Sequence, residues 1–417
     1  MSVSVTAGTT PAARAEDLLH RLHDRFERGP GLGWAVLALS TIGLIAAKWN
    51  ESPRRRVDFH IYYQAVRDSR PASLYDYAHP TQKLGFTYPP FSALVIWPLT
   101  KLSEHTAEIL WLVSSSLLGV VFWLICAQRI SSHRMARLPG WAVPLVAAAG
   151  MWTLPVVLTV RIGQINAFVA IMLAIEVVLL ERRSNLSGMG IGAATAMKLT
   201  PGLLIPFLWF CGRRREAVQA AAFTVIFTAI GAIPYPSDTK RYFRTELWDT
   251  NRVGSLDRKL NNGVRRYITW LPLGNGLQTL IWIVLAAVVL VVGFKRSREA
   301  FRNGDVLRAV SLVMCVTYVV SPITWSHHMW FAGVLGAIWL FEARSRFDVI
   351  VGLVAAAVIF DPFEGGEGSV TSIIRTVVML VLIAQIPVGA GAPPLLDVRG
   401  WLAAEAFTPT PAGARSG

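Results

Sequence analysis

The sequence predicts an all-α, polytopic membrane protein, and its composition supports this fold class. Of the 417 residues, 53% are hydrophobic and only 16% are charged, and the mean hydropathy is +0.46. A soluble domain of this composition would expose too much apolar surface, which excludes an ordinary cytoplasmic enzyme. Because a spanning helix needs roughly 20 apolar residues, the chain has room for about ten full spans and some polar loops.

The N-terminal segment is expected to lie in the cytoplasm. Residues 1–31 are polar and contain four arginines, and an apolar run follows over about residues 32–49. No small-residue cleavage site comes after that run, so we interpret it as an uncleaved first span. The segment before it is either an amphipathic helix on the membrane surface or a partly disordered tail.

Nine further apolar runs are predicted to complete one transmembrane domain, residues 32–389, with residues 390–417 as a tail. The connections between runs carry basic clusters that share one side if the N-terminus is inside, as the positive-inside rule requires. We therefore expect a multi-pass protein of the plasma membrane. The runs cover about residues 107–128, 141–159, 165–181, 216–234, 277–294, 305–321, 328–343, 347–360 and 371–389, and the clusters lie at 129–137, 182–183, 213–215, 295–302 and 344–346.

One stretch does not fit a single span. Residues 186–211 have basic clusters at both ends and Lys-Leu-Thr-Pro in their middle, at 198–201. Two short half-spanning helices that enter from the inside and return satisfy both constraints. Broken helices at membrane depth are tolerated only where protein or a water-filled cavity covers the free backbone, so the break predicts a cavity.

The polar loops on the outer, periplasmic face are predicted to carry the chemistry. They cover about residues 51–106, 235–276, 321–328 and 361–370. After Pro89 and Pro90, an apolar run to Leu99 is too short for a span and is interpreted as an interfacial helix. The outer loops are therefore expected to lie partly in the membrane interface.

The net charge and the cysteines exclude several other functions. The formal net charge is +14, but in a membrane protein such an excess serves topology and lipid phosphates first, so no nucleic-acid partner is predicted. The cysteines at 126, 211 and 315 lie in or at the ends of apolar runs, without paired spacing. Neither a disulfide framework nor a metal site is predicted.

A carboxylate beside a basic cluster follows the first span. Asp58 lies at the outer boundary of the membrane, where a general base can reach the hydroxyl of an acceptor next to a lipid-linked donor. Alternatively, Asp58 only pairs with the arginines at 54–56. These arginines either snorkel harmlessly or hold a lipid phosphate. The predicted binding residues of this segment are Arg54, Arg55, Arg56, His60 and Tyr62.

Three further motifs lie near predicted helix ends. Tyr88 stands in Phe-Thr-Tyr-Pro-Pro, which by itself is a structural corner. Gln164 and Asn166 offer amides that suit sugar hydroxyls, or simply end a helix. Lys198 is an intramembrane cation, for which a phosphate partner or snorkelling are the alternatives. We expect all four to line a substrate site.

The later outer loops contain an aromatic and imidazole cluster and an amide and arginine cluster. Trp325, His327 and His328 indicate a sugar site or a proton-transfer role, although adjacent helical positions diverge by about 100°, so one imidazole is expected to face the chemistry. Two histidines without a third ligand make a weak metal signal. Asn261, Asn262, Arg265 and Arg266 suit a phosphorylated or glycosylated headgroup, or a solvated loop.

Taken together, these motifs resemble the GT-C-type integral-membrane glycosyltransferases of family 87. The resemblance covers about residues 34–390, and within the family it is strongest to actinobacterial α-(1→2)-mannosyltransferases. It implies polyprenyl-phosphate-mannose as donor, and a phosphatidylinositol mannoside or related cell-envelope glycolipid as acceptor. It also implies that Asp58 is the essential first-loop aspartate, and that His327 or His328 lies in the catalytic pocket. The Asn-Asn-Gly run at 261–263 departs from the commoner Asn-Gln-Ser form.

The chemistry implied by the resemblance is an inverting displacement, because the donor mannose is β-linked and the product α-linked. Asp58 or His327 would take the acceptor proton, and cations would stabilise the phosphate leaving group without a metal or other cofactor. The alternatives are a mannosyltransferase that branches lipomannan or lipoarabinomannan and an arabinofuranosyltransferase that uses polyprenyl-phosphate-arabinose. From another class, a sugar transporter or lipid flippase shares the broken helices around an intramembrane charge.

Overall fold

The fold is helical throughout the part of the chain that the structure describes. The computed structural model describes residues 21, 31–49, 56–69, 72–132, 138–343, 345–360 and 369–389. Within these residues the regular elements are helices, and one isolated β-bridge joins Ala78 to Gly85. The predicted all-α fold class is confirmed.

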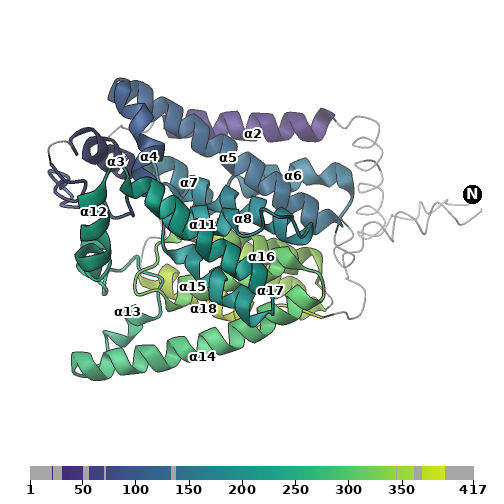
Figure 1. Ribbon diagram of the computed structural model, residues 1–417. Coiled ribbons are helices and arrows are strands. Elements are labelled where there is room, and N and C mark those ends of the chain that lie inside the picture. The colour runs from purple at the N-terminus through teal and green to yellow at the C-terminus, as the bar shows by residue number, and fades with distance from the viewer. Residues whose placement is uncertain are drawn as a thin grey trace, which may run out of the picture.

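Most helices coincide with the predicted apolar runs, and shorter helices occupy the predicted outer loops (Figure 1). Their bounds are α2 Gly31–Trp49, α3 Val57–Arg67, α4 Phe91–Ile96, α5 Glu104–Ser132, α6 Val143–Gly150, α7 Leu154–Ile162, α8 Asn166–Glu181, α9 Met189–Met197, α10 Leu204–Phe210, α11 Arg214–Ala232, α12 Pro236–Arg241, α13 Arg265–Ile268, α14 Asn275–Arg302, α15 Val306–Val320, α16 Trp330–Phe341, α17 Arg346–Phe360 and α18 Ser369–Gln385.

Several helices have the length and hydropathy of membrane spans. Among the described residues, α2, α5 and α14 are long and apolar enough to cross a bilayer, and the bent pair α6 and α7 makes a fourth if it forms one span. Shorter apolar helices lie at Thr200–Phe210, Val306–Val320, Trp330–Phe341 and Val370–Gln385. The chain is therefore a helical membrane protein.

The predicted run at 141–159 is not one continuous helix, which corrects the prediction. It divides into α6 and α7, whose axes are bent by 51°. Thr153 has extended backbone angles as the N-cap of α7, and Pro155 stands in the first turn, where its missing N–H breaks no intrahelical hydrogen bond, whereas in one continuous helix it would remove such a bond. The bend allows α7 to end beside α3.

Residues 186–211 form two short helices with a break between them, as predicted. Helix α9 ends at Met197, Lys198 leaves the helix with an extended conformation, and a 3₁₀ turn, η4 Thr200–Leu203, leads into α10. Pro201 lies in the first turn of η4. The side chain of Lys198 is therefore placed at an interruption of the helical backbone.

Two ion pairs lie close together at one end of the helices. Arg129, near the end of α5, pairs with Glu181 at the end of α8, and Arg308 in the first turn of α15 pairs with Glu342, directly after α16. Figure 1 shows α3, α4, α12 and α13 gathered at one end. Helices α8 and α15 run between these ends in opposite directions.

Candidate active site

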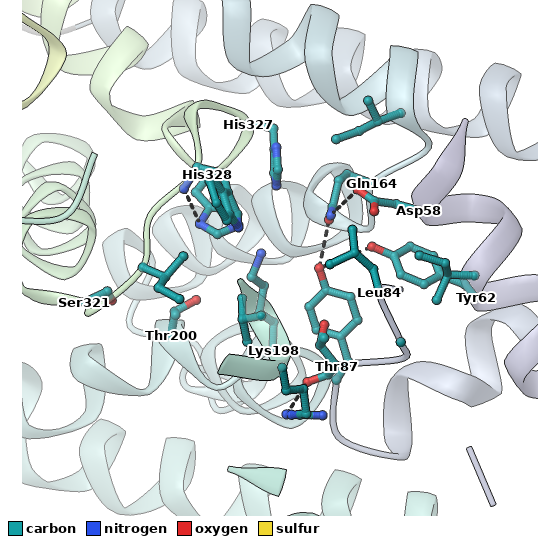
Figure 2. A pocket seen from close by; sticks show the side chains of 18 of the residues that line it. Asp58, Tyr62, Leu84, Thr87, Gln164, Lys198, Thr200, Ser321, His327 and His328 are labelled. Carbon is teal, nitrogen blue, oxygen red and sulfur yellow. Dashed lines mark hydrogen bonds between the residues drawn. The ribbon is translucent and has the colours of Figure 1, made fainter. Parts of the chain in front are cut away.

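One cavity of about 640 Å³ opens where α3, the α7–α8 junction, the break after α9 and the loop after α15 meet. Figure 2 shows side chains from these segments pointing into it. Residues far apart in the sequence therefore share one site. Eight of the predicted site residues line it, namely Asp58, Tyr62, Tyr88, Gln164, Lys198, Trp325, His327 and His328.

Asp58 lies in the first turn of α3 and is fixed by the α7–α8 junction. Its Oδ2 accepts a hydrogen bond of 2.6 Å from Nε2 of Gln164. The junction approaches α3 closely because Gly163 has a φ of 73°, and a Cβ at that position would lie 2.5 Å from Cβ of Phe59. Glycine is required there both for the left-handed backbone and for the contact.

A chain of hydrogen bonds continues from Asp58 into the cavity wall. Oε1 of Gln164 accepts from the hydroxyl of Tyr88 at 2.8 Å, and that hydroxyl accepts from Tyr62 at 3.3 Å. The ionised carboxylate fixes which end of the Gln164 amide faces it, because a carboxylate only accepts hydrogen bonds whereas the tyrosine hydroxyl can donate or accept. The NH₂ group must then point at Asp58.

Burial raises the pKa of Asp58 to about 6, and the hydrogen bond from Gln164 and the charge of Lys198 act in the opposite direction. A carboxyl group with this pKa is largely ionised at pH 7 but holds a transferred proton better than an ordinary aspartate. The side chain is therefore suited to general-base chemistry.

Lys198 reaches the same cavity from the other side. Its Nζ donates to Oδ1 of Asn166 at 2.7 Å and lies 5.4 Å from the centre of the Tyr88 ring. Asn166 in turn donates through Nδ2 to the backbone oxygen of His327 at 2.9 Å. One amide therefore connects the cation to the histidine turn.

The two histidines occupy a short 3₁₀ turn, η7 Ser326–His328, and their rings meet edge to face with centroids 4.6 Å apart. Burial lowers the pKa of both well below its ordinary value, and the charge of Lys198 adds to the effect. Both imidazoles are therefore neutral at pH 7. Nε2 of His327 is buried without a hydrogen-bond partner among the described residues, so it is available to a substrate.

Comparison with known proteins identifies the family. The glycosyltransferase family 87 profile matches residues 86–322. This chain belongs to glycosyltransferase family 87. The match includes Tyr88, Gln164 and Lys198, whereas Asp58 and the histidine turn lie outside the matched range.

Curated relatives of this family 87 member cover most of the chain. It is 31% identical to the polyprenol-phosphate-mannose-dependent alpha-(1-2)-phosphatidylinositol pentamannoside mannosyltransferase of Mycolicibacterium smegmatis. The aligned 283 residues cover 65% of this chain and 66% of that protein. The protein of the same name from Mycobacterium tuberculosis is 31% identical over 70% of this chain and 67% of its own length. The Mycobacterium tuberculosis alpha-(1-2)-phosphatidylinositol mannoside mannosyltransferase that depends on the same donor is 28% identical over 78% of this chain and 79% of its length.

Several residues predicted to bind substrate do not line the large cavity of this family 87 member. The guanidinium of Arg56 forms an ion pair with Glu108 and donates to the backbone oxygen of Lys48 at 2.8 Å. His60 bonds to Glu104 through Nδ1 at 2.5 Å. Both side chains contact the start of α5, so the pairing of Arg56 with Asp58 is wrong. Arg54 and Arg55 lie outside the described residues.

The amide and arginine cluster of the large outer loop supports the histidine turn from outside the cavity. Oδ1 of Asn261 accepts from the backbone N–H of Thr324, and Nδ2 of Asn262 donates to the backbone oxygen of Thr324. Arg266 is fully buried and donates to the backbone oxygen of Asn261, and Arg265 stacks on Trp282. Asn166 likewise lines only a small adjoining cavity.

Some lining residues were not singled out as site residues from the sequence. Arg161, Glu246, Asp249, Arg252 and Arg258 add charge to the cavity wall. Arg252 donates to the backbone oxygens of residues 86 and 87 and pairs with Glu246, so it fixes the segment that carries Tyr88. Arg161 could have been selected from the sequence, because it stands two positions before the Gly163 turn.

Metal ligands do not gather in the described part of the chain. No group of three or more His, Cys, Asp or Glu side chains has the geometry to hold an ion there. The cavity instead combines three carboxylates, one lysine, three arginines and two neutral imidazoles with several uncharged hydrogen-bonding side chains.

Proposed function

We propose that this chain transfers mannose from polyprenyl-phosphate-mannose to a mannosyl hydroxyl of a phosphatidylinositol mannoside or a related glycolipid, forming an α-(1→2) linkage. The observation that carries the proposal is the single cavity that combines Asp58, Lys198 and the histidine turn in a member of glycosyltransferase family 87. The names of the relatives support the donor and the acceptor class.

Asp58 is the proposed general base. In the transfer step the acceptor oxygen forms a bond to the anomeric carbon, the bond from that carbon to the phosphate oxygen breaks, and the acceptor proton moves to the carboxylate. A pKa near 6 suits this role at neutral pH. The pKa of His327 lies well below its usual value, because burial disfavours the protonated imidazole, and this weakens the imidazole as a base. We assign His327 a substrate hydrogen bond instead.

Lys198 is proposed to neutralise the charge that develops on the departing polyprenyl phosphate. Within the described part of the chain, its ammonium group donates to one acceptor, Asn166, at 2.7 Å, and an ammonium carries three donors, so two remain for a phosphate. A preorganised cation in a site closed to bulk water stabilises such charge more strongly than one in water. Tyr62, Tyr88, Gln164 and Trp325 complete the proposed binding surface.

We further propose a GT-C-type arrangement with about ten spans, the α9–α10 pair as a re-entrant pair, a cytoplasmic N-terminus and a periplasmic active site. Helix α8 supports the orientation: it begins with Asn166 beside the cavity and ends at Glu181, which pairs with Arg129 of a basic cluster. Basic clusters favour the cytoplasmic side. The cavity at the opposite end of α8 would then face outwards.

The transfer reaction is tested with the purified chain in lipid nanodiscs. Polyprenyl-phosphate-mannose and phosphatidylinositol mannosides of defined length should give a product one hexose heavier by mass spectrometry, and an α-(1→2)-specific mannosidase should remove that hexose. A nucleotide-linked mannose serves as the negative donor control. Absence of transfer from the lipid-linked donor would overturn the proposal, and transfer of arabinose instead would favour the arabinosyltransferase alternative.

The orientation is tested with single cysteines in a variant that lacks the three native cysteines. A cysteine at Asp257 should react with an impermeant thiol reagent in intact cells. Cysteines at Ser132 and Ser184 should react only after the membrane is opened. Labelling at Ser184 in intact cells would contradict the re-entrant arrangement.

A further inference from the structure

A buried carboxylate holds the start of α9, at the far end of this helix from Lys198. Glu176 lies on α8 and has no solvent exposure. One carboxylate oxygen accepts from the backbone N–H of Gly188 at 2.6 Å, and the other accepts from that of Gly190 at 2.9 Å. These N–H groups belong to the first turn of α9, where no intrahelical acceptor exists for them.

Helix α9 is closely packed between α8 and α11. A Cβ on Gly190 would lie 2.4 Å from the backbone oxygen of Met172, and a Cβ on Gly192 would lie 2.4 Å from Cβ of Phe223. Small residues allow membrane helices to approach this closely. The absence of side chains at these glycines determines how near α9 lies to its neighbours, but close packing alone does not set the position of α9 along α8.

Hydrogen bonds to α8 at both ends of α9 set that position, and Oγ of Ser187, just before α9, also donates to the backbone oxygen of Leu179 at 3.0 Å. Glu176 holds the first turn of α9, and Asn166, also on α8, accepts from the ammonium group of Lys198 after the last turn. Ten residues of α8 separate the two contacts, which is about 15 Å at the helical rise. Helix α9 has nine residues and so spans nearly the same length. Both ends of α9 are therefore attached to the same helix.

We propose that Glu176 is a positioning residue that sets the register of α9 against α8 and thereby presents Lys198 to the cavity. The inference rests on the role of Lys198 in the proposed function. A glutamine at this position retains one acceptor oxygen but turns an NH₂ group towards one of the two backbone donors, so one of the two hydrogen bonds from residue 176 to the start of α9 is lost. A shift of α9 by a fraction of a turn would move the ammonium group away from the reacting phosphate.

The test is a double-mutant cycle on turnover. Glu176→Gln should lower kcat about 10- to 100-fold, the size associated with a misplacement of about 1 Å, and should leave the acceptor KM within about twofold. In a Lys198→Met background the same substitution should lower kcat by less than about twofold, because the group it positions is already absent. The matched control is Glu181→Gln on the same helix, where the carboxylate only pairs with Arg129. An equal loss from Glu176→Gln in both backgrounds would overturn the proposal.

A second measurement does not depend on transferase activity. In a variant without native cysteines, Lys198→Cys should react with a small cationic thiol reagent at a rate that Glu176→Gln changes at least about fivefold and Glu181→Gln leaves unchanged. If wild-type protein transfers no mannose, the proposed function fails while this measurement still tests the position of residue 198. Equal rates in the two glutamate variants would refute the positioning role. If Glu176→Gln does not fold, Glu176→Asp is used instead, because it keeps the charge on a shorter side chain. It should change the reaction rate of the cysteine at position 198 in the direction expected for Glu176→Gln.

Discussion

Replacing Asp58 with asparagine should abolish mannosyl transfer and, at neutral pH, make the folded protein more stable. The asparagine oxygen can still accept the hydrogen bond that Gln164 donates to Asp58 at 2.6 Å, so the shape of the site is kept and only the charge is removed. Positioned bases contribute about 10²- to 10⁴-fold to rates. Turnover should therefore fall at least about a hundredfold.

The gain in stability follows from the pKa. Burial raises the pKa of Asp58 from 3.8 to about 6, and one unit of such a difference corresponds to about 1.4 kcal/mol, so ionisation of this carboxyl group lowers the free energy of unfolding by up to about 3 kcal/mol. The folded state prefers the protonated form, so the stabilising contribution of the protonated carboxyl group is fully present below about pH 4 and is lost as the pH rises through 6.

The assay combines both effects. Initial rates are measured at saturating donor, and unfolding temperatures are measured in the same detergent at pH 4.5 and 7.5. Asp58→Asn should unfold at a higher temperature than wild type at pH 7.5, with a smaller difference at pH 4.5, and the exposed Asp257→Asn should change neither quantity. More than a tenth of wild-type turnover would rule out the base. An unfolding temperature lowered equally at both pH values would mean that lost activity reflects a damaged fold.

Three further substitutions test other parts of the site. Gln164→Leu removes a hydrogen bond that lowers the pKa of Asp58, so the acid limb of kcat/KM should move from near pH 6 to higher pH by about one unit; a limb that stays in place would contradict the assignment. His327→Ala should lose more turnover than His328→Ala, because Nε2 of His327 has no partner among the described residues, and equal, mild losses would indicate a structural role for both. Gly163→Ala should lower the free energy of unfolding by about 2–4 kcal/mol, because it adds both left-handed backbone strain and a close contact with Phe59. Chemical denaturation measures this loss against that of Gly212→Ala, whose position has a φ of 81° but nothing within 4 Å. Equal losses in the two variants would show that the contact with Phe59 has no effect.

The sequence was sufficient to predict the helical fold and many of the cavity residues. Apolar runs report spans directly, because the bilayer requires a fixed length of apolar helix. A carboxylate, an amide pair, an intramembrane lysine and two histidines are also rare enough near predicted helix ends to be selected without coordinates. Asp58, Gln164 and Lys198 do line one cavity. The bend at Pro155 was missed because the hydropathy of the run continues through it.

The predicted roles of Arg56, Asn261 and Asn262 could not be assessed from local pattern. Arg56 has an acidic neighbour two positions away in the sequence, yet its partner is Glu108, on a helix that begins at Glu104. The two asparagines have the composition of a sugar site, but their hydrogen bonds go to the backbone of the turn at Thr324. In each case the partner is distant in sequence, and only the tertiary fold decides between a ligand and a protein group.

The segment from Gly163 to Asn166 explains how the site keeps the carboxylate of Asp58 and the ammonium group of Lys198 in one cavity without a direct ion pair between them. A direct ion pair with Lys198 would lower the pKa of Asp58 and weaken it as a base. Instead, the amide of Gln164 donates to Asp58, and the amide of Asn166, two positions later, accepts from Lys198. An amide side chain has both a donor and an acceptor, so two successive amides can hold opposite charges from one turn. A carboxylate at position 164 would repel Asp58, whereas the amide of Gln164 donates to it and the amide oxygen of Asn166 accepts from Lys198 without adding a negative charge to the site.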